Sequence, residues 1–128
     1  MKVQWSDWKN SYELELFSAD SAVEFLQKLR LELKMPAMVE FFNPASGRSI
    51  CVGVGRDVSV VTYQDSNDPP YYISAGCEEG DGAVVFCYGN EDTEYLLVNA
   101  ISFELASLAV ADFFRTNRRF EGIEWEKL

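Results

Sequence analysis

Histidine is missing from this sequence of 128 residues, and basic residues are few. Without histidine the chain lacks the commonest general base and the commonest metal ligand of proteins. Its 11 Lys and Arg stand against 21 Asp and Glu, which gives a formal net charge of −10. Nucleic-acid phosphates and anionic membrane surfaces are both bound through clustered cations. The composition therefore argues against binding to nucleic acid or to a membrane, and it leaves little equipment for catalysis.

Long apolar runs and paired cysteines are missing as well. No stretch approaches the roughly 20 apolar residues that span a bilayer, and the N-terminal residues lack the apolar core of a secretion signal. The three cysteines, Cys51, Cys77 and Cys87, form no CxxC pair, and an odd number does not suggest a disulfide framework. We therefore expect a reducing, cytoplasmic compartment, with no cofactor and no metal. The length and the lack of linkers or repeats predict one domain over residues 1–128.

Two segments have the apolar periodicity of helices. In the first, apolar residues recur every three or four positions over 22–33. Asp20 or Ser21 is a suitable N-cap, and Ser21 with Glu24 has the spacing of a capping box. We expect this helix to end near Lys34, because a proline follows two positions later.

The second helix is expected to begin after Ser102, a good N-cap, and to end at Asn117, which tolerates the left-handed conformation of a C-cap. Elsewhere apolar and polar residues alternate with the period of strands. Strands are expected at 12–17, 38–43, 49–54, 57–63, 71–74, 83–88, 94–98 and 122–125. The order predicts an α+β fold, with a single antiparallel meandering sheet and two helices packed on one face.

Acid–base or nucleophilic catalysis has few candidates. Glu78 with Asp81, or Glu91 with Glu94, could supply a pair of carboxyl groups, but both pairs lie in polar turns where side chains are hydrated. Cys77 has no histidine to activate it, and the two glutamates that follow it raise the pKa of a thiol rather than lower it. We therefore expect no enzyme activity. A small acid–base hydrolase is the one catalytic alternative that these residues leave open.

The acidic residues are concentrated in three expected loops. They are Asp65 and Asp68 in the first loop, Glu78, Glu79 and Asp81 in the second, and Glu91, Asp92 and Glu94 in the third. Tyr71 and Tyr72 lie between the first two loops, and tyrosine is a favoured residue at protein interfaces. Loops of one charge sign with tyrosines are typical of a surface that binds a basic protein partner. The other interpretation is that the charges serve solubility and the tyrosines belong to the core.

The C-terminal third has a distinctive pattern. An alanine-rich helical segment from Ala106 leads to the pair Phe113-Phe114, a turn, and a short strand that contains Trp125 between two glutamates. Together with the segment 70–76 (PYYISAG), this pattern resembles immunity protein family 1 of bacterial polymorphic toxin systems. The family often has Gly and then Pro in the last turn, where this chain has Asn117 and Phe120.

The resemblance implies a small α+β protein that binds and neutralises one cognate toxin, often a nucleic-acid deaminase. It implies structural roles for Phe113, Phe114 and Trp125. The residues that face the toxin differ between members, so none is transferred from the family. The implied partner is a basic toxin domain, a zinc-dependent cytidine deaminase or alternatively a nuclease, whose substrate groove or active site an acidic surface would occlude.

A second class of function also fits the residues. The chain could be a general acidic interaction or adaptor module, possibly a homodimer, unrelated to any toxin. In that case Val39, Phe41 and Tyr71 would line an exposed face of the sheet.

Overall fold

The computed structural model describes residues 1–76 and 81–128, so that Cys77, Glu78 and Glu79 lie outside the described residues. The elements are β1 (Lys2–Ser6), β2 (Ser11–Glu15), α1 (Ala19–Glu32), β3 (Ala37–Phe42), β4 (Ser49–Val54), β5 (Val58–Ser59), β6 (Val61–Gln64), β7 (Tyr71–Ala75), β8 (Ala83–Tyr88), β9 (Glu91–Leu96), the 3₁₀ turn η1 (Leu97–Asn99), β10 (Ile101–Ser102), α2 (Phe103–Thr116) and β11 (Glu124–Lys127). Among these described elements, no helix is long and apolar enough to cross a membrane.

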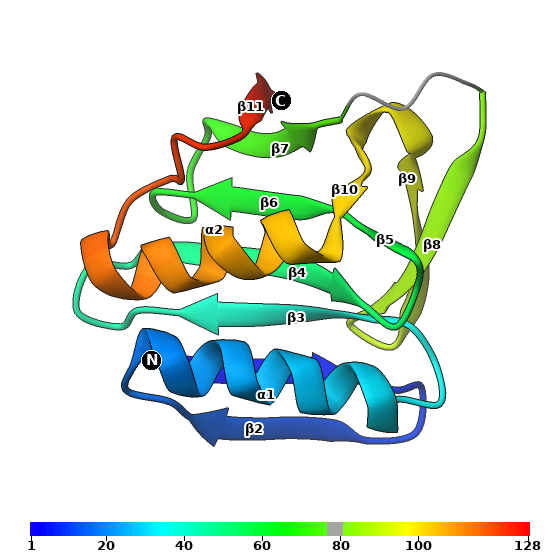
Figure 1. Cartoon of the computed structure of the whole chain (residues 1–128), viewed down its shortest axis with the longest axis horizontal. Coiled ribbons are helices and arrows are strands. Elements are labelled where there is room, and N and C mark those ends of the chain that lie inside the picture. The colour runs from blue at the N-terminus through cyan, green and yellow to red at the C-terminus, as the bar shows by residue number, and fades with distance from the viewer. Residues whose placement is uncertain (77–80) are drawn as a thin grey trace.

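The large sheet has the strand order β11-β7-β6-β4-β3-β1-β2, and neighbouring strands along this path are antiparallel. Figure 1 shows α1 and α2 on the same face of the sheet. We call this the helix face and the opposite one the back face. The predicted α+β class, with both helices on one face, is confirmed. The strands β3, β4, β6 and β7 form the expected meander, whereas β8 joins the sheet through a single parallel bridge between Ala37 and Cys87.

The strands differ from the prediction at the N-terminus and in the segment 57–63. No strand was expected at the N-terminus, but β1 lies between β2 and β3 and pairs with both. Its residues Val3 and Trp5 do alternate with polar ones, although the segment is short. The strand expected at 57–63 is broken at Val60 into β5 and β6, because the Ser59 hydroxyl donates to the Gly53 carbonyl (2.7 Å) and β5 pairs with β10 instead.

The start of α1 also differs from the prediction. Its N-cap is Ser18 rather than Asp20 or Ser21. The Ser18 hydroxyl accepts from the Ser21 N–H (3.1 Å), and the Ser21 hydroxyl accepts from the Ser18 N–H (3.3 Å). Serine thus occupies both ends of the capping box, where Glu or Gln is usual at the second position. The helix also ends earlier than predicted, at Glu32, with Leu33 as its C-cap.

Both ends of α2 are as predicted. The Ser102 hydroxyl accepts from the Leu105 N–H (3.1 Å), which satisfies one of the unpaired donors of the first turn. Asn117 ends the helix in the left-handed conformation, with φ 55° and ψ 34°. Its N–H donates to the Phe113 carbonyl (2.8 Å). Asparagine thus fills the position where a glycine is commonest.

The helix face carries the main core. Leu26 of α1, Phe41 of β3 and Phe113 of α2 are fully buried there, and Phe114 meets Phe41 edge-on at a centroid distance of 5.9 Å. Val39 and Phe41 have 0% of their surface exposed. The exposed apolar face that the adaptor hypothesis required is therefore absent at these two residues, because the helices cover it.

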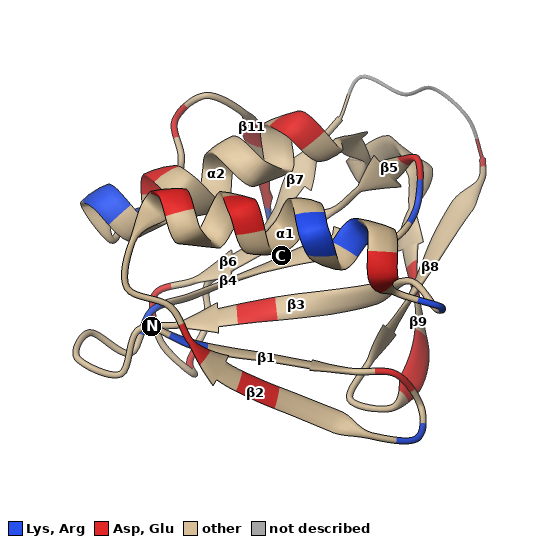
Figure 2. Cartoon of the chain, turned by 60° about the horizontal axis from the view of Figure 1, so that its bottom comes forward, with Lys and Arg blue, Asp and Glu red and all other residues tan. Residues whose placement is uncertain are grey.

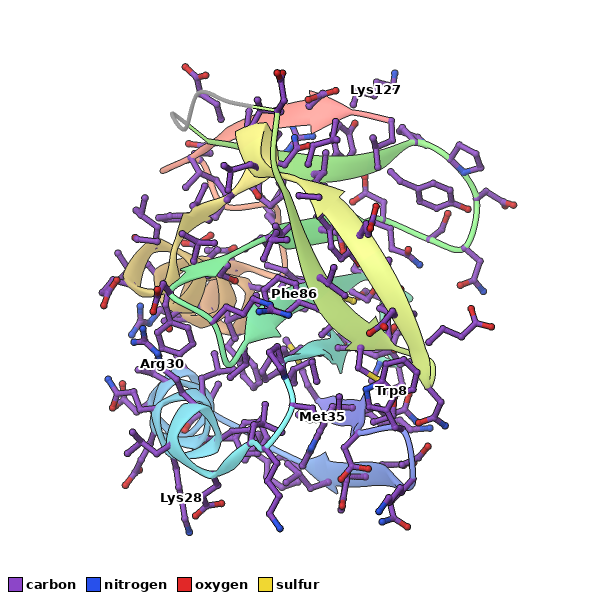
Figure 3. The ribbon with its side chains drawn as sticks, turned by 90° about the vertical axis from the view of Figure 1, so that its right-hand side faces the viewer. Trp8, Lys28, Arg30, Met35, Phe86 and Lys127 are labelled. Carbon is purple, nitrogen blue, oxygen red and sulfur yellow. The ribbon has the colours of Figure 1, made fainter. Side chains whose placement is uncertain are left out.

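The back face has a smaller core beneath β8 and β9. Met38, Cys51 and Ile73 project from the sheet and pack against the fully buried Phe86 of β8. In Figure 3 the β8–β9 pair crosses the sheet on the side away from the helices. The Phe86 ring fills the space over Gly53, where a Cβ would lie only 2.5 Å from the ring. The glycine thus allows β8 to approach the back face closely.

Candidate functional site

The antiparallel pair β8–β9, which we call the ribbon, carries one of the predicted acidic groups. Glu91, Asp92 and Glu94 were expected in a loop, but they lie in β9 and are exposed. The turn between the two strands is shorter than predicted and consists of Gly89 and Asn90, both with positive φ (59° and 63°). Two such residues form the tight turn that matches the twist of a hairpin, so the strand resumes at once.

The acids of β9 have no cationic partner in the described part of the chain. The ion pairs found there join Lys2 to Glu13, Arg30 to Glu104, Arg48 to Asp65 and Arg115 to Asp20. Figure 2 shows acidic segments on β2, β3 and β9, which belong to or border the back face. The ribbon therefore presents uncompensated negative charge to solvent.

The first predicted acidic loop, between β6 and β7, has a different role. Asp65 accepts a hydrogen bond from the Tyr63 hydroxyl (2.8 Å) and forms an ion pair with Arg48 (3.3 Å). Burial, followed by this bond to Asp65, raises the pKa of Tyr63 to about 12. The Tyr71 hydroxyl donates to the Asn67 carbonyl within the same loop, while Asp68 is exposed. Asp65 and Tyr71 thus hold the loop together, and the Asp68 side chain is exposed to solvent.

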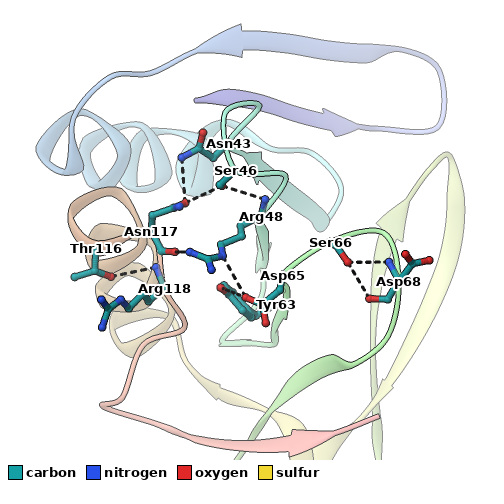
Figure 4. Close-up of polar contacts among 10 residues, drawn as sticks. All are labelled: Asn43, Ser46, Arg48, Tyr63, Asp65, Ser66, Asp68, Thr116, Asn117 and Arg118. Atoms are coloured by element: carbon teal, nitrogen blue, oxygen red, sulfur yellow. Dashed lines mark hydrogen bonds and ion pairs between the residues drawn. The ribbon is translucent and has the colours of Figure 1, made fainter.

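The same loop is tied to the end of α2 (Figure 4). Arg48 donates to the Asn117 carbonyl (3.1 Å) while it pairs with Asp65. The Asn117 side-chain oxygen accepts from Asn43 (3.0 Å) and from Ser46 (3.2 Å). This network joins two loops of the sheet to the left-handed C-cap of the helix. Its polar groups satisfy one another, which makes it a structural site.

The remaining predicted contacts are placed separately. The Arg119 guanidinium lies 3.9 Å from the centre of the Tyr72 ring, so one side of this tyrosine is occupied. Asp81 is exposed just before β8, and Glu78 and Glu79 lie outside the described residues. In Figure 1 the β6–β7 loop lies at the left end of the sheet and the ribbon at the right. The structure therefore does not bring the first and third acidic groups together.

A cleft of about 310 Å³ opens on the back face, between the β1–β2 hairpin and the tip of the ribbon. Its lining is Gln4, Trp5, Ser6, Ser11, Tyr12, Glu13, Met38, Glu40, Tyr88 and Gly89. The two walls are joined, because the Asn90 N–H donates to the Ser6 hydroxyl (3.1 Å). Sequence reasoning missed this site. The available signal was Glu40, a single charge inside the otherwise apolar strand AMVEFF.

Glu40 governs the electrostatics of the cleft. The Cys51 thiol donates to its carboxylate across a sulfur–oxygen distance of 3.9 Å. Burial, and then the charge of Glu40, raise the pKa of Cys51 to about 12, so the thiol stays protonated and unreactive. The pKa of Tyr88 is also raised, by Cys51 first, then by burial and by Glu40. Of the two carboxylates that line the cleft, Glu13 is paired with Lys2, and Glu40 lies among neutral hydroxyl and thiol groups, which suits a cation and not nucleophilic chemistry.

Metal binding has no support from clustered ligands in residues 1–76 and 81–128. No three His, Cys, Asp or Glu side chains there are placed to hold one ion. None of the described ion pairs involves Glu40 or the acids of β9.

The sequence model of one protein family, Immunity protein Imm1, matches residues 14–127. No curated protein matches the chain. The match covers nearly the whole fold, from the end of β2 to β11. It includes the ribbon and four of the ten residues that line the cleft, while β1 and most of β2 precede it. The chain therefore belongs to the Imm1 immunity protein family, which makes it an immunity protein against a bacterial toxin.

Proposed function

We propose that this immunity protein binds its cognate toxin directly in the cytoplasm and blocks a basic substrate groove with the ribbon side of its back face. The toxin we propose is a zinc-dependent nucleic-acid deaminase. The observation that carries the proposal is the set of exposed acids on β9, Glu91, Asp92 and Glu94, which have no cationic partner among the described residues.

The chemistry of the partner supports this assignment. An enzyme that acts on nucleic acid needs a positively charged groove for the phosphates and a pocket for the target base. Carboxylates on an inhibitor can occupy the positions of the phosphates. Complementary charges also accelerate association, towards about 10⁸–10⁹ M⁻¹s⁻¹ at low salt. A nuclease would present a similar groove, so the activity of the toxin distinguishes the two. Inhibition of this kind requires no catalysis by the immunity protein.

The direct test uses the toxin domain encoded beside this chain. We expect one equivalent of immunity protein to abolish deamination of a single-stranded oligonucleotide, and the association rate to fall steeply as salt is raised. A toxin that remains fully active at a stoichiometric ratio would refute the proposal. A toxin that is inhibited but cleaves rather than deaminates would replace the deaminase by a nuclease.

Matched charge variants test the surface. Neutralising Glu91, Asp92 and Glu94 (to Gln, Asn and Gln) should slow association and weaken binding, with unchanged thermal stability. The control variant Glu24→Gln, Glu32→Gln, Glu121→Gln changes the net charge equally at exposed acids outside the ribbon and the cleft. We expect the control to bind almost as tightly as the wild type. Equal losses in both variants would show that only net charge matters and would remove β9 from the interface.

A further inference from the structure

We propose that the cleft on the back face holds one arginine side chain of the toxin, with Trp8 as a neighbouring contact at its rim. This inference rests on the proposed function, and it places the centre of the interface at residues outside the predicted acidic loops. Three features of the cleft support it: the exposed Tyr88 ring on its ribbon side, the Glu40 carboxylate and the conformation of the adjoining turn.

The ribbon side of the cleft is aromatic. The rings of Trp5 and Tyr12, by contrast, stack on each other on the helix side of the β1–β2 hairpin, where Trp5 meets Phe25 of α1 at a centroid distance of 5.3 Å. Tyr88 faces the cleft from the ribbon with 43% of its surface exposed. Met38 contributes a buried apolar side chain. A planar guanidinium stacks on aromatic faces and is more weakly hydrated than an ammonium, so the exposed Tyr88 ring favours arginine over lysine.

The carboxylates lie in a row across three strands. In the register of the sheet, Gln4 of β1 is opposite Glu13 of β2 on one side and Glu40 of β3 on the other. The Gln4 amide donates to Glu13 (3.2 Å), and Lys2 compensates the charge of Glu13 at 3.5 Å. Glu40 is half-buried, and its hydrogen-bond partner within the described chain is the neutral Cys51 thiol. Its charge is therefore available for a cation that enters from outside.

The β1–β2 turn adds an exposed tryptophan beside this row. Trp8 has φ 82°, a conformation that is unusual for a bulky residue. Asp7 fixes the turn: its carboxylate accepts from the N–H groups of Lys9 (3.2 Å) and Asn10 (2.9 Å) and from the Tyr12 hydroxyl (2.9 Å). Asp7 directly follows Ser6, which lines the cleft and accepts from the Asn90 N–H of the ribbon tip, so the turn adjoins the cleft.

The position and exposure of Trp8 suit a binding contact. It lies beside the tip of the ribbon in Figure 3, and 36% of its surface is exposed. Strained backbone that is held in place by its surroundings is common at binding sites, and tryptophan is among the residues enriched in interface hot spots. A preformed turn also lowers the entropy that is lost on binding.

Other occupants fit the cleft less well. A divalent cation needs several oxygen ligands, and the described residues offer no group of three acidic or thiol ligands for it. An anionic ligand would meet Glu40 and Glu13, and the described lining residues include no Lys or Arg to receive it. An arginine fits the cleft better, since it is a planar cation that can bind a single carboxylate through two hydrogen bonds.

The test compares Glu40→Gln with Glu15→Gln. Both variants remove one negative charge from the back side of the sheet, but Glu15 does not line the cleft. We expect Glu40→Gln to weaken toxin binding at least about 10-fold, the scale of a charge-assisted hydrogen bond within an interface. Glu15→Gln should bind within about twofold of wild type, because exposed charge pairs contribute little. An alanine scan of toxin arginines should find one whose effect disappears in the Glu40→Gln background.

Trp8→Gly supplies a readout that a purely structural role would not give. Glycine adopts φ 82° without strain, so the variant should keep or raise the melting temperature while it loses affinity for the toxin. Unchanged affinity in both Trp8→Gly and Glu40→Gln, with tight binding by the wild type, would overturn the cleft assignment and leave the proposed function intact. A wild type that does not bind the toxin would overturn both.

Discussion

The two faces of the sheet differ in what covers them and in how much charge they carry. The helix face is covered by α1 and α2 and packs Leu26, Phe41 and Phe113 into one continuous core. The back face is covered only by the ribbon, and beyond the small cluster around Phe86 it is polar, with Glu13 and Glu40 in one row. Apolar burial on the first face supplies the stability, because that area is large. The second face can therefore carry charges that contribute nothing to folding.

This difference between the faces explains how an acidic chain can be stable and still carry uncompensated negative charge. Uncompensated carboxylates repel one another and destabilise a compact state. On the back face they are tolerated, since strands β1, β3 and β4 are already held by pairing on both sides and by the helices. The comparison predicts that substitutions on the helix face change stability, whereas substitutions at the ribbon tip and the cleft change toxin binding.

The largest loss of stability is expected from a substitution on the helix face. Phe113→Ala removes a fully buried ring that meets Tyr63 edge-on at 6.0 Å, and it should lower the free energy of unfolding by about 3–5 kcal/mol. Urea denaturation followed by tryptophan fluorescence measures this loss, and Phe113→Leu is the milder control. The molecules that remain folded should still inhibit the toxin. Lost inhibition at unchanged stability would contradict the assignment of this face to folding.

An intermediate effect is expected where the ribbon meets the back face. Gly53→Ala places a methyl group about 2.5 Å from the Phe86 ring and should cost roughly 1–3 kcal/mol, the usual penalty of overpacking. Because the ring can yield only by moving β8, toxin binding should weaken as well. The double variant Gly53→Ala, Phe86→Leu makes room for the methyl group and should recover part of both losses. No recovery would mean that Gly53 is required for another reason.

Much of the fold was predictable because it follows from local signals. Ser102 and Asn117 mark α2 correctly, and β4 and β8 have the predicted bounds, since caps and period-two alternation act within a few residues. The α1 cap was misplaced because serines and an aspartate crowd its start. The edge of β9 was misplaced because its acids suggest a loop. The tight two-residue turn at Gly89 and Asn90 instead lets the strand begin at Glu91.

The site was less predictable because it depends on long-range pairing. Asp65 appeared to be a free acid, yet Arg48 and Tyr63, which are near to it only in the fold, engage its carboxylate. The cleft needs β1 beside β3 to place Glu40 near Glu13, and β1 was not predicted. A sequence pattern shows which residues carry charge, but it does not show which charges are already paired.

The third prediction concerns alkaline pH and involves one tyrosine near each face. Burial raises the pKa of Tyr63, on the helix face, and of Tyr95, in the ribbon, to about 12 from an ordinary value near 10. Folding therefore favours the protonated form. The resulting stability is present in full below pH 10 and is lost as the pH rises towards 12.

Unfolding in urea at pH 7, 10 and 11 tests this sign. Tyr95→Phe should reduce the alkaline loss with little change at pH 7. Tyr63→Phe should reduce it too, but it should also cost about 0.5–1.5 kcal/mol at neutral pH, because it removes the hydrogen bond to Asp65. Stability that is flat from pH 7 to pH 11 in the wild type would contradict the burial of both hydroxyl groups.

The smallest change in stability is expected at the ribbon edge. Glu91, Asp92 and Glu94 are exposed and have no cationic partner among the described residues, so their neutralisation should shift the free energy of unfolding by no more than about 0.5 kcal/mol. The sign should be stabilising, because like charges are removed from one strand. If the triple variant unfolded much more readily, these acids would belong to the fold after all. A small gain in stability together with weaker toxin binding would locate the negative charge where it serves the partner rather than the chain itself.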